Sequence, residues 1–192
     1  MKFLIASLAL MLSCSAMGAI SEDGFGFAVD PNRAIVVHHT TSGQFQEVNL
    51  YLCIFEPSLG GVAGWECSLD IEGNPIAANW TITAGLNVSG VSNVFQVGIG
   101  YAVALRPGPS GLVHVATWSA LVSDSSSVIK LYLMRYPDSV TFDSTAGYAG
   151  PNEGLMELST PGNYNNIPDF QINGTNDAFQ ERTWTEVKEL YR

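Results

Sequence analysis

Apolar and polar residues alternate along most of this chain, and this period of two constrains the fold more than any other feature. Between Trp65 and Ile71, the odd-numbered positions are apolar and the even-numbered positions are polar or charged. Successive side chains of a β-strand point to opposite faces, so such a segment buries one face and exposes the other. We therefore expect strands over 24–29, 34–37, 48–55, 62–71, 79–84, 94–105, 112–122 and 128–134, and a shorter one at 155–158. Trp65, Trp80 and Trp118 alternate within these strands and are expected in the core.

Turns rich in Gly, Pro, Asn and Ser separate these segments, without a helical pattern of adequate length between them. This favours an all-β antiparallel β-sandwich, of jelly-roll or Ig-like type, over a parallel α/β sheet. We expect one domain over 20–182, with a long loop excursion over 143–166. The one helix expected is C-terminal, where Thr183 and Glu186 form a capping box and an apolar stripe ends at Tyr191. Because so short a helix is marginal alone in water, 183–192 should dock on the sandwich or on a partner.

The N-terminus has the pattern of a secretory signal peptide over 1–19. Lys2 precedes an apolar run from Phe3 to Leu12, and small residues follow. The run is shorter than the roughly 20 residues that cross a bilayer as a helix, so no transmembrane segment is expected. We predict a secreted, periplasmic or cell-surface protein. The alternative is a lipoprotein anchored at Cys14, although Leu12 stands where that signal normally has a small residue.

The charge of the chain excludes two classes of partner. The formal net charge is −10, with eighteen acidic residues against eight basic ones. A surface this acidic repels phosphate backbones and anionic lipids. We therefore expect neither nucleic-acid binding nor electrostatic attachment to a membrane.

Two cysteines remain in the expected mature chain, and in an oxidising compartment a pair is first interpreted as a disulfide. If 48–55 and 62–71 form a hairpin folded about Gly60, Cys53 lies opposite Cys67, at a separation near the short limit for a disulfide. The same register sets Leu52 opposite Ser68 and Leu50 opposite Asp70. Either another element covers that apolar face or the cysteines pair with an offset; two free buried thiols are the alternative to a Cys53–Cys67 disulfide.

Candidate catalytic and metal-binding residues do not form a recognisable motif. His38 and His39 are adjacent on a predicted strand and therefore point to opposite faces, and His114 is expected to be half-buried. Asp70 and Glu72 have the spacing of a glycosidase pair, as any alternate acidic residues on a strand do. The oxygen-rich stretch 169–177 does not match a calcium-binding loop, and no nucleophile elbow or zinc motif is present. We expect no catalytic residue, metal or cofactor.

Two tyrosines in the expected loop excursion, Tyr148 and Tyr164, are the candidate ligand-binding residues. Aromatic rings in a loop can stack on sugars, although the same rings can instead pin the loop to the domain. A second candidate is the small-residue face of 94–105, which contains Gln96 and Ala102 and would suit a flat partner. Asn79, Asn87 and Asn173 begin glycosylation sequons, which are acceptors only in a eukaryotic host.

Several segments together resemble the pattern of cohesin-like sandwiches, namely 50–55 (LYLCIF), 62–67 (VAGWEC), 95–98 (FQVG) and 112–116 (LVHVA). With its front 24–29 and its end 184–192, the whole chain is also similar to uncharacterised secreted bacterial proteins. The resemblance implies a jelly-roll-like sandwich with a non-catalytic role. Our first hypothesis is an interaction module without catalytic activity that binds an extracellular protein or another cell-surface component. The alternative is a carbohydrate-binding module with a polysaccharide partner, and a small secreted hydrolase is the third hypothesis. The cysteine pair and the terminal helix depart from the cohesin pattern, and no dockerin-binding residues can be carried over.

Overall fold

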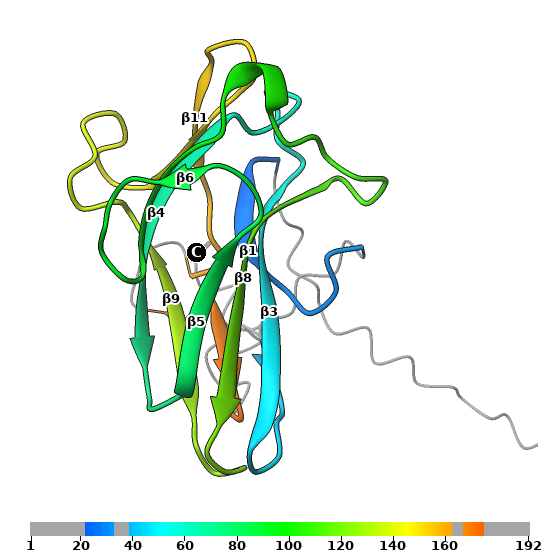
Figure 1. The fold of residues 1–192 in the computed structure, drawn as a ribbon, viewed down its shortest axis with the longest axis vertical. Coiled ribbons are helices and arrows are strands. Elements are labelled where there is room, and N and C mark those ends of the chain that lie inside the picture. Colours follow the sequence, from blue (N-terminus) through cyan, green and yellow to red (C-terminus); the bar gives the residue numbers. More distant parts are fainter. Residues whose placement is uncertain (1–21, 33–38, 163–166, 175–192) are drawn as a thin grey trace, which may run out of the picture.

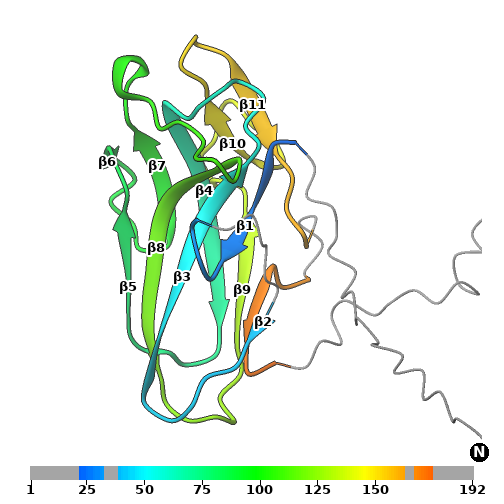
Figure 2. The same ribbon diagram turned by 90° about the vertical axis from the view of Figure 1, so that its right-hand side faces the viewer.

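The computed structural model of this chain describes residues 22–32, 39–162 and 167–174, and this part is all-β. Its strands form two sheets that are antiparallel except at one short pair (Figures 1 and 2). Three predicted segments lie outside the described residues, namely the signal peptide 1–19, the strand 34–37 and the helix 183–192.

The first sheet has four strands in the order β1-β3-β8-β5. They are β1 (Gly24–Ala28), β3 (Gln46–Phe55), β8 (Leu112–Val122) and β5 (Ile76–Ile82). The expected strands 48–55 and 112–122 are confirmed here, the latter with the same bounds, whereas the strand expected over 79–84 lies at 76–82.

The second sheet has eight strands, six of which follow the order β11-β10-β4-β9-β12-β2. β7 pairs with β4 and β6 pairs with β7, while β12 and β2 form the parallel pair. The bounds are β11 (Leu155–Leu158), β10 (Ala146–Ala149), β4 (Gly64–Glu72), β9 (Ile129–Met134), β12 (Phe170–Ile172), β2 (His39–Thr40), β7 (Val94–Gly98) and β6 (Leu86–Asn87).

One hydrophobic core lies between the two sheets, and the alternation of each strand supplies it. On β3, Leu50, Leu52 and Ile54 point into this core, and on β4 the alternate residues Trp65 and Cys67 do the same. Burying one face of each sheet in this way removes apolar side chains from water, which is the main favourable term in folding. The prediction that Trp65 and Trp118 are core residues is confirmed, since both are buried.

The expected hairpin between 48–55 and 62–71 is wrong, because these two strands belong to different sheets. β3 pairs with β1 and β8, and it places Leu50 opposite Trp118 and Leu52 opposite Ala116. These apolar pairs replace the mismatches that the hairpin would have set against Ser68 and Asp70. The polar mismatch was therefore a sign of the wrong partner strand.

The cysteine prediction changes for the same reason. The pairing of β3 with β8 shifts between Leu52 and Cys53, where Val115 of β8 is an extra residue, as in a β-bulge. Cys53 lies in a separate cluster with Phe55 and Leu112, whereas Cys67 belongs to the main core. Both cysteines are buried free thiols, so in this fold the Cys53–Cys67 disulfide is not formed.

The predicted strand 94–105 is too long. β7 ends at Gly98, and a single 3-10 turn, η1, follows over Tyr101–Val103. Gly100 has a φ of 103°, a conformation that glycine adopts without a steric penalty and that breaks an extended strand. The flat face expected over Gln96 and Ala102 therefore does not exist as one strand surface.

The expected loop excursion 143–166 contains two strands. β10 and β11 form an antiparallel hairpin, and β10 also pairs with β4, so this segment extends the second sheet. The predicted strand 155–158 is confirmed with its bounds, but β10 was missed because its sequence, AGYA, is too short and too rich in small residues to show alternation.

Candidate functional site

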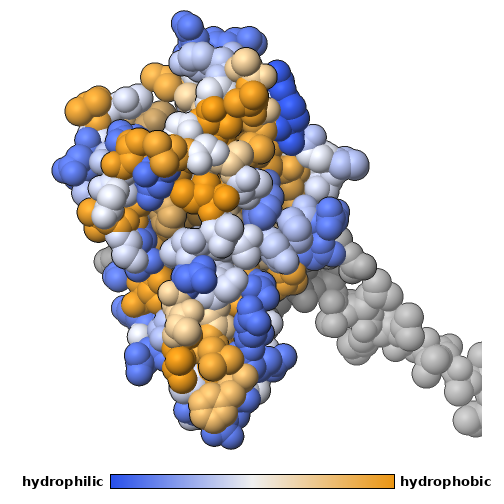
Figure 3. Space-filling model, viewed as in Figure 1, coloured by the Kyte–Doolittle hydropathy of each residue, from blue (hydrophilic) through white to orange (hydrophobic). Residues whose placement is uncertain are grey.

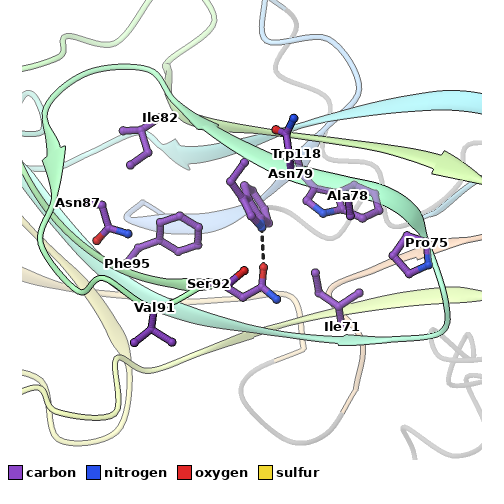
Figure 4. Close-up of a pocket in the computed structure, with 12 residues that line it drawn as sticks. Ile71, Pro75, Ala78, Asn79, Ile82, Asn87, Val91, Ser92, Phe95 and Trp118 are labelled. Atoms are coloured by element: carbon purple, nitrogen blue, oxygen red, sulfur yellow. Dashed lines mark hydrogen bonds between the residues drawn. The ribbon is translucent and has the colours of Figure 1, made fainter.

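A pocket of about 520 Å³ opens on the side of the molecule where β5 passes from one sheet toward the other. Figure 2 shows β5, β6 and β7 along one side of the molecule, and Figure 4 shows the side chains around the pocket. Ile71 of β4 and Pro75 form one apolar end of the pocket, and Ile82 and Val91 add further apolar surface.

Two glycines place β5 over the pocket. The chain leaves β4 in the second sheet at Gly73, runs through β5 in the first sheet, and returns to the second sheet at Gly85. Their φ angles are 100° and 91°, and an added Cβ would lie 2.5 Å and 2.4 Å from backbone carbonyl oxygens. Only glycine fits such a turn without strain, so these positions determine where the chain crosses between the sheets.

Three aromatic side chains form the wall of the pocket. The ring of Trp80 on β5 packs edge-on against Phe95 of β7, with the two ring centroids 5.3 Å apart. The centroid of the Trp80 ring lies 6.4 Å from that of Trp118 on β8. Phe95 and Trp118 are almost fully buried, whereas Trp80 is only partly buried and faces the pocket. The prediction that all three tryptophans within strands are core residues therefore holds for two of them and misses the role of Trp80.

Asn93 connects the two sheets at this pocket. Its side-chain Oδ1 accepts a 2.9 Å hydrogen bond from the indole N–H of Trp80 on the first sheet. Its backbone oxygen accepts a 2.8 Å bond from the N–H of Leu69 on the second sheet. Asn93 has a φ of 59°, which asparagine tolerates better than most residues, so both bonds can form from one position.

Asn87 holds the loop that forms the rim. Its Nδ2 donates to the Val94 oxygen at 2.9 Å, and its Oδ1 accepts from the N–H groups of Gln96 at 2.9 Å and Ser89 at 3.2 Å. Because both ends of this amide are bonded to the loop, the rim is formed before any ligand enters. The Asn87 side chain therefore stabilises the loop. Asn173, which also begins a sequon, has a similar structural role, because its Oδ1 accepts a 2.7 Å hydrogen bond from the N–H of Ser42.

One donor in the pocket wall has no acceptor. The indole N–H of Trp118 is buried and lacks a hydrogen-bond partner among the described residues. Figure 4 shows this side chain at the back of the pocket. A buried polar group without a partner costs free energy.

The chain segment that supplies most of the pocket lining is uncharged. The stretch from Gly73 to Leu105 contains no Asp, Glu, Lys, Arg or His, although the whole chain has a net charge of −10. We name the exposed side chains of this stretch the neutral surface. Its large apolar members are Ile76, Leu86, Val88, Val91, Tyr101 and Val103.

Hydrophobic side chains gather over this part of the molecule in the space-filling view of Figure 3. Leu86 is 69% exposed and Val88 is 61% exposed, so neither contributes much to the core. Exposed apolar patches of this kind mark interaction sites. Sequence reasoning proposed only the part of this stretch over 94–105, and the absence of charge from 73 to 105 was the signal that could have located the whole surface.

Tyr148 does not form a stacking platform. The residue is 1% exposed, and its hydroxyl donates to Asp23 and accepts a 3.2 Å bond from the N–H of Leu59. Burial and the bond to Asp23 raise its pKa. The alternative, that this tyrosine pins its segment to the domain, is the correct one, and the predicted ligand-binding role is wrong. Tyr164 lies outside the described residues.

The remaining candidates have structural roles. The half-buried His114 is bonded to Thr117 at 3.0 Å, and burial lowers its pKa. Glu72 pairs with Lys130 at 3.2 Å on an exposed strand end, next to the exposed Asp70. Within the described residues, no group of three or more His, Cys, Asp or Glu side chains is placed to hold a metal ion.

The oxygen-rich stretch also serves the fold. Asp169 is 2% exposed, and its carboxylate accepts hydrogen bonds from the backbone N–H groups of Leu133 at 2.6 Å and Gly162 at 2.7 Å. Burial raises its pKa to about 6, while these two bonds act in the opposite direction. His38 and the end of the stretch, 175–177, lie outside the described residues.

Comparisons of this chain with protein-family models, with curated proteins and with solved structures found no match. The resemblance to cohesin-like sandwiches therefore stays a prediction. Over 22–32, 39–162 and 167–174, the structure lacks a helix with the length and hydrophobicity of a membrane span.

Proposed function

We propose that this protein is a non-catalytic binding module that holds an extracellular protein or another cell-surface component on its neutral surface. The observation that carries the proposal is the charge-free stretch from Gly73 to Leu105, which exposes large apolar side chains on an otherwise acidic chain. A partner that meets this surface does not have to approach or desolvate a carboxylate.

The proposal includes location and fold type. A module of this kind would work outside the cytoplasm, as the predicted signal peptide suggests, either secreted, in the periplasm or anchored as a lipoprotein at Cys14. The two facing antiparallel sheets support a sandwich of jelly-roll, Ig-like or cohesin-like type.

The test is retention of material from the envelope of the cells that make the protein, measured on beads that carry the purified chain. Val88→Asp and Val91→Asp place a charge on the neutral surface at exposed positions and should lower retention at least tenfold. Val140→Asp is the matched control, because Val140 is 97% exposed and lies outside the stretch. Equal retention by all three variants and the unchanged protein would contradict the proposal.

A further inference from the structure

We propose that the pocket beside Trp80 binds a sugar unit of an uncharged glycan. This inference rests on the proposed function, because it names the ligand class for one part of the neutral surface. The pocket volume of about 520 Å³ falls within the range of about 300–1,000 Å³ that is typical of small-molecule sites.

The chemistry of the lining fits a sugar ring. A pyranose presents C–H groups on its faces and hydroxyls around its edge, so it is bound by an aromatic face together with amide and hydroxyl groups. Trp80 supplies the partly exposed ring, and Asn79 and Ser92 supply exposed polar side chains on the rim.

The same lining disfavours charged ligands. The pocket has no cationic side chain among the described residues that line it, so a carboxylate, sulfate or phosphate would lose its hydration without gaining an ion pair. The negative charge of the chain adds long-range repulsion of anions. We therefore expect neutral hexose or N-acetylhexosamine units to bind, and sugars with acidic groups not to bind.

The pocket is preorganised for this ligand. Trp80 is held in place by its 2.9 Å bond to Asn93, and three bonds to the Asn87 amide hold the rim loop. A site whose side chains are already ordered loses less conformational entropy when a ligand binds.

The experiment is an array of neutral oligosaccharides built from hexoses and N-acetylhexosamines, with uronic-acid and sulfated oligosaccharides of matched length. We expect a signal on at least one neutral class and at least tenfold less on its acidic counterpart. Trp80→Ala should lower the neutral signal at least tenfold. A chain that binds no neutral oligosaccharide, or that binds equally well without the Trp80 ring, would overturn the inference.

A second variant separates loss of binding from loss of folding. Ala78 is exposed on the pocket rim, so Ala78→Glu should fill and charge the pocket without disturbing the core. We expect this variant to keep the urea midpoint of the unchanged chain and to lose the glycan signal, whereas Val140→Glu should keep both. A folded Ala78→Glu chain with full glycan binding would place the ligand elsewhere and refute the assignment.

The two proposals can fail separately. If Val88→Asp and Val91→Asp abolish envelope retention while no neutral oligosaccharide binds, the sugar assignment fails and the binding module stands. If glycan binding depends on Trp80 while Val88→Asp and Val91→Asp leave envelope retention unchanged, the proposal that the wider neutral surface binds the partner fails and the sugar pocket stands.

Discussion

The buried carboxylate of Asp169 should make this protein more stable in mild acid than at neutral pH. Its pKa is raised from 3.8 to about 6 in the folded chain, mainly by burial. Each pKa unit corresponds to about 1.4 kcal/mol, so the shift corresponds to about 3 kcal/mol of folding free energy. Because the folded pKa is the higher one, this stability is fully present below pH 3.8 and is lost as the pH rises through about 6.

The perturbation that isolates this group is Asp169→Asn. The amide has one oxygen, so it can replace only one of the two bonds that the carboxylate accepts from Leu133 and Gly162. In acid, where the carboxyl group of the unchanged chain is protonated, the variant should therefore be the less stable of the two. It should also lack the contribution of about 3 kcal/mol that varies between pH 3.8 and about 6.

The assay is urea unfolding followed by tryptophan fluorescence at a series of pH values. The net charge of −10 also makes stability depend on pH, but that effect is nearly the same in both chains and cancels when their free energies of unfolding are subtracted. The difference should shrink by about 3 kcal/mol as the pH rises through the window, which is a relative midpoint shift on the order of 1 M urea or more. Asp138→Asn, at an exposed position, is the control and should show no such change. A difference between the Asp169→Asn chain and the unchanged chain that stays constant with pH would refute the reasoning.

Two further predictions concern the pocket and the cysteines. Asn93→Gly keeps the left-handed backbone but removes the acceptor of the Trp80 indole, and it should lower the free energy of unfolding by about 1–3 kcal/mol in the same urea assay; an unchanged midpoint would show that this bond does not stabilise the fold. Burial raises the pKa of the Cys53 thiol to about 12 and that of Cys67 well above its usual value, so alkylation should be slow in the folded chain and complete after unfolding without a reductant. Mass spectrometry of the two cysteine peptides decides this, and a species that needs a reductant before it reacts would show the disulfide to be present.

Much of the strand content could be predicted because alternation is a local property. The segments that became β3, β4, β8 and β9 are visible in the sequence, since each repeats apolar residues at every second position. Short strands such as β10 and β6 were missed, because two to four residues cannot establish a period.

The candidate site could be predicted only in part. The charge-free stretch is in the sequence, and it locates the neutral surface without any structure. The pocket is different, because Trp80 alternates with polar neighbours just as Trp118 does. Their different exposure depends on the position of each strand, since β5 is an edge strand of the first sheet and β8 lies between two others.

The sequence by itself therefore determined which segments are strands, which face of each is apolar, and that the chain is acidic with one neutral stretch. The tertiary structure decided which strands are neighbours. The alternation on β3 does not identify its partner strand. Long-range packing makes β8 that partner, which places Cys53 and Cys67 in different clusters. The same packing leaves Trp80 at the open side of the two sheets, where a side chain expected in the core becomes the wall of a pocket.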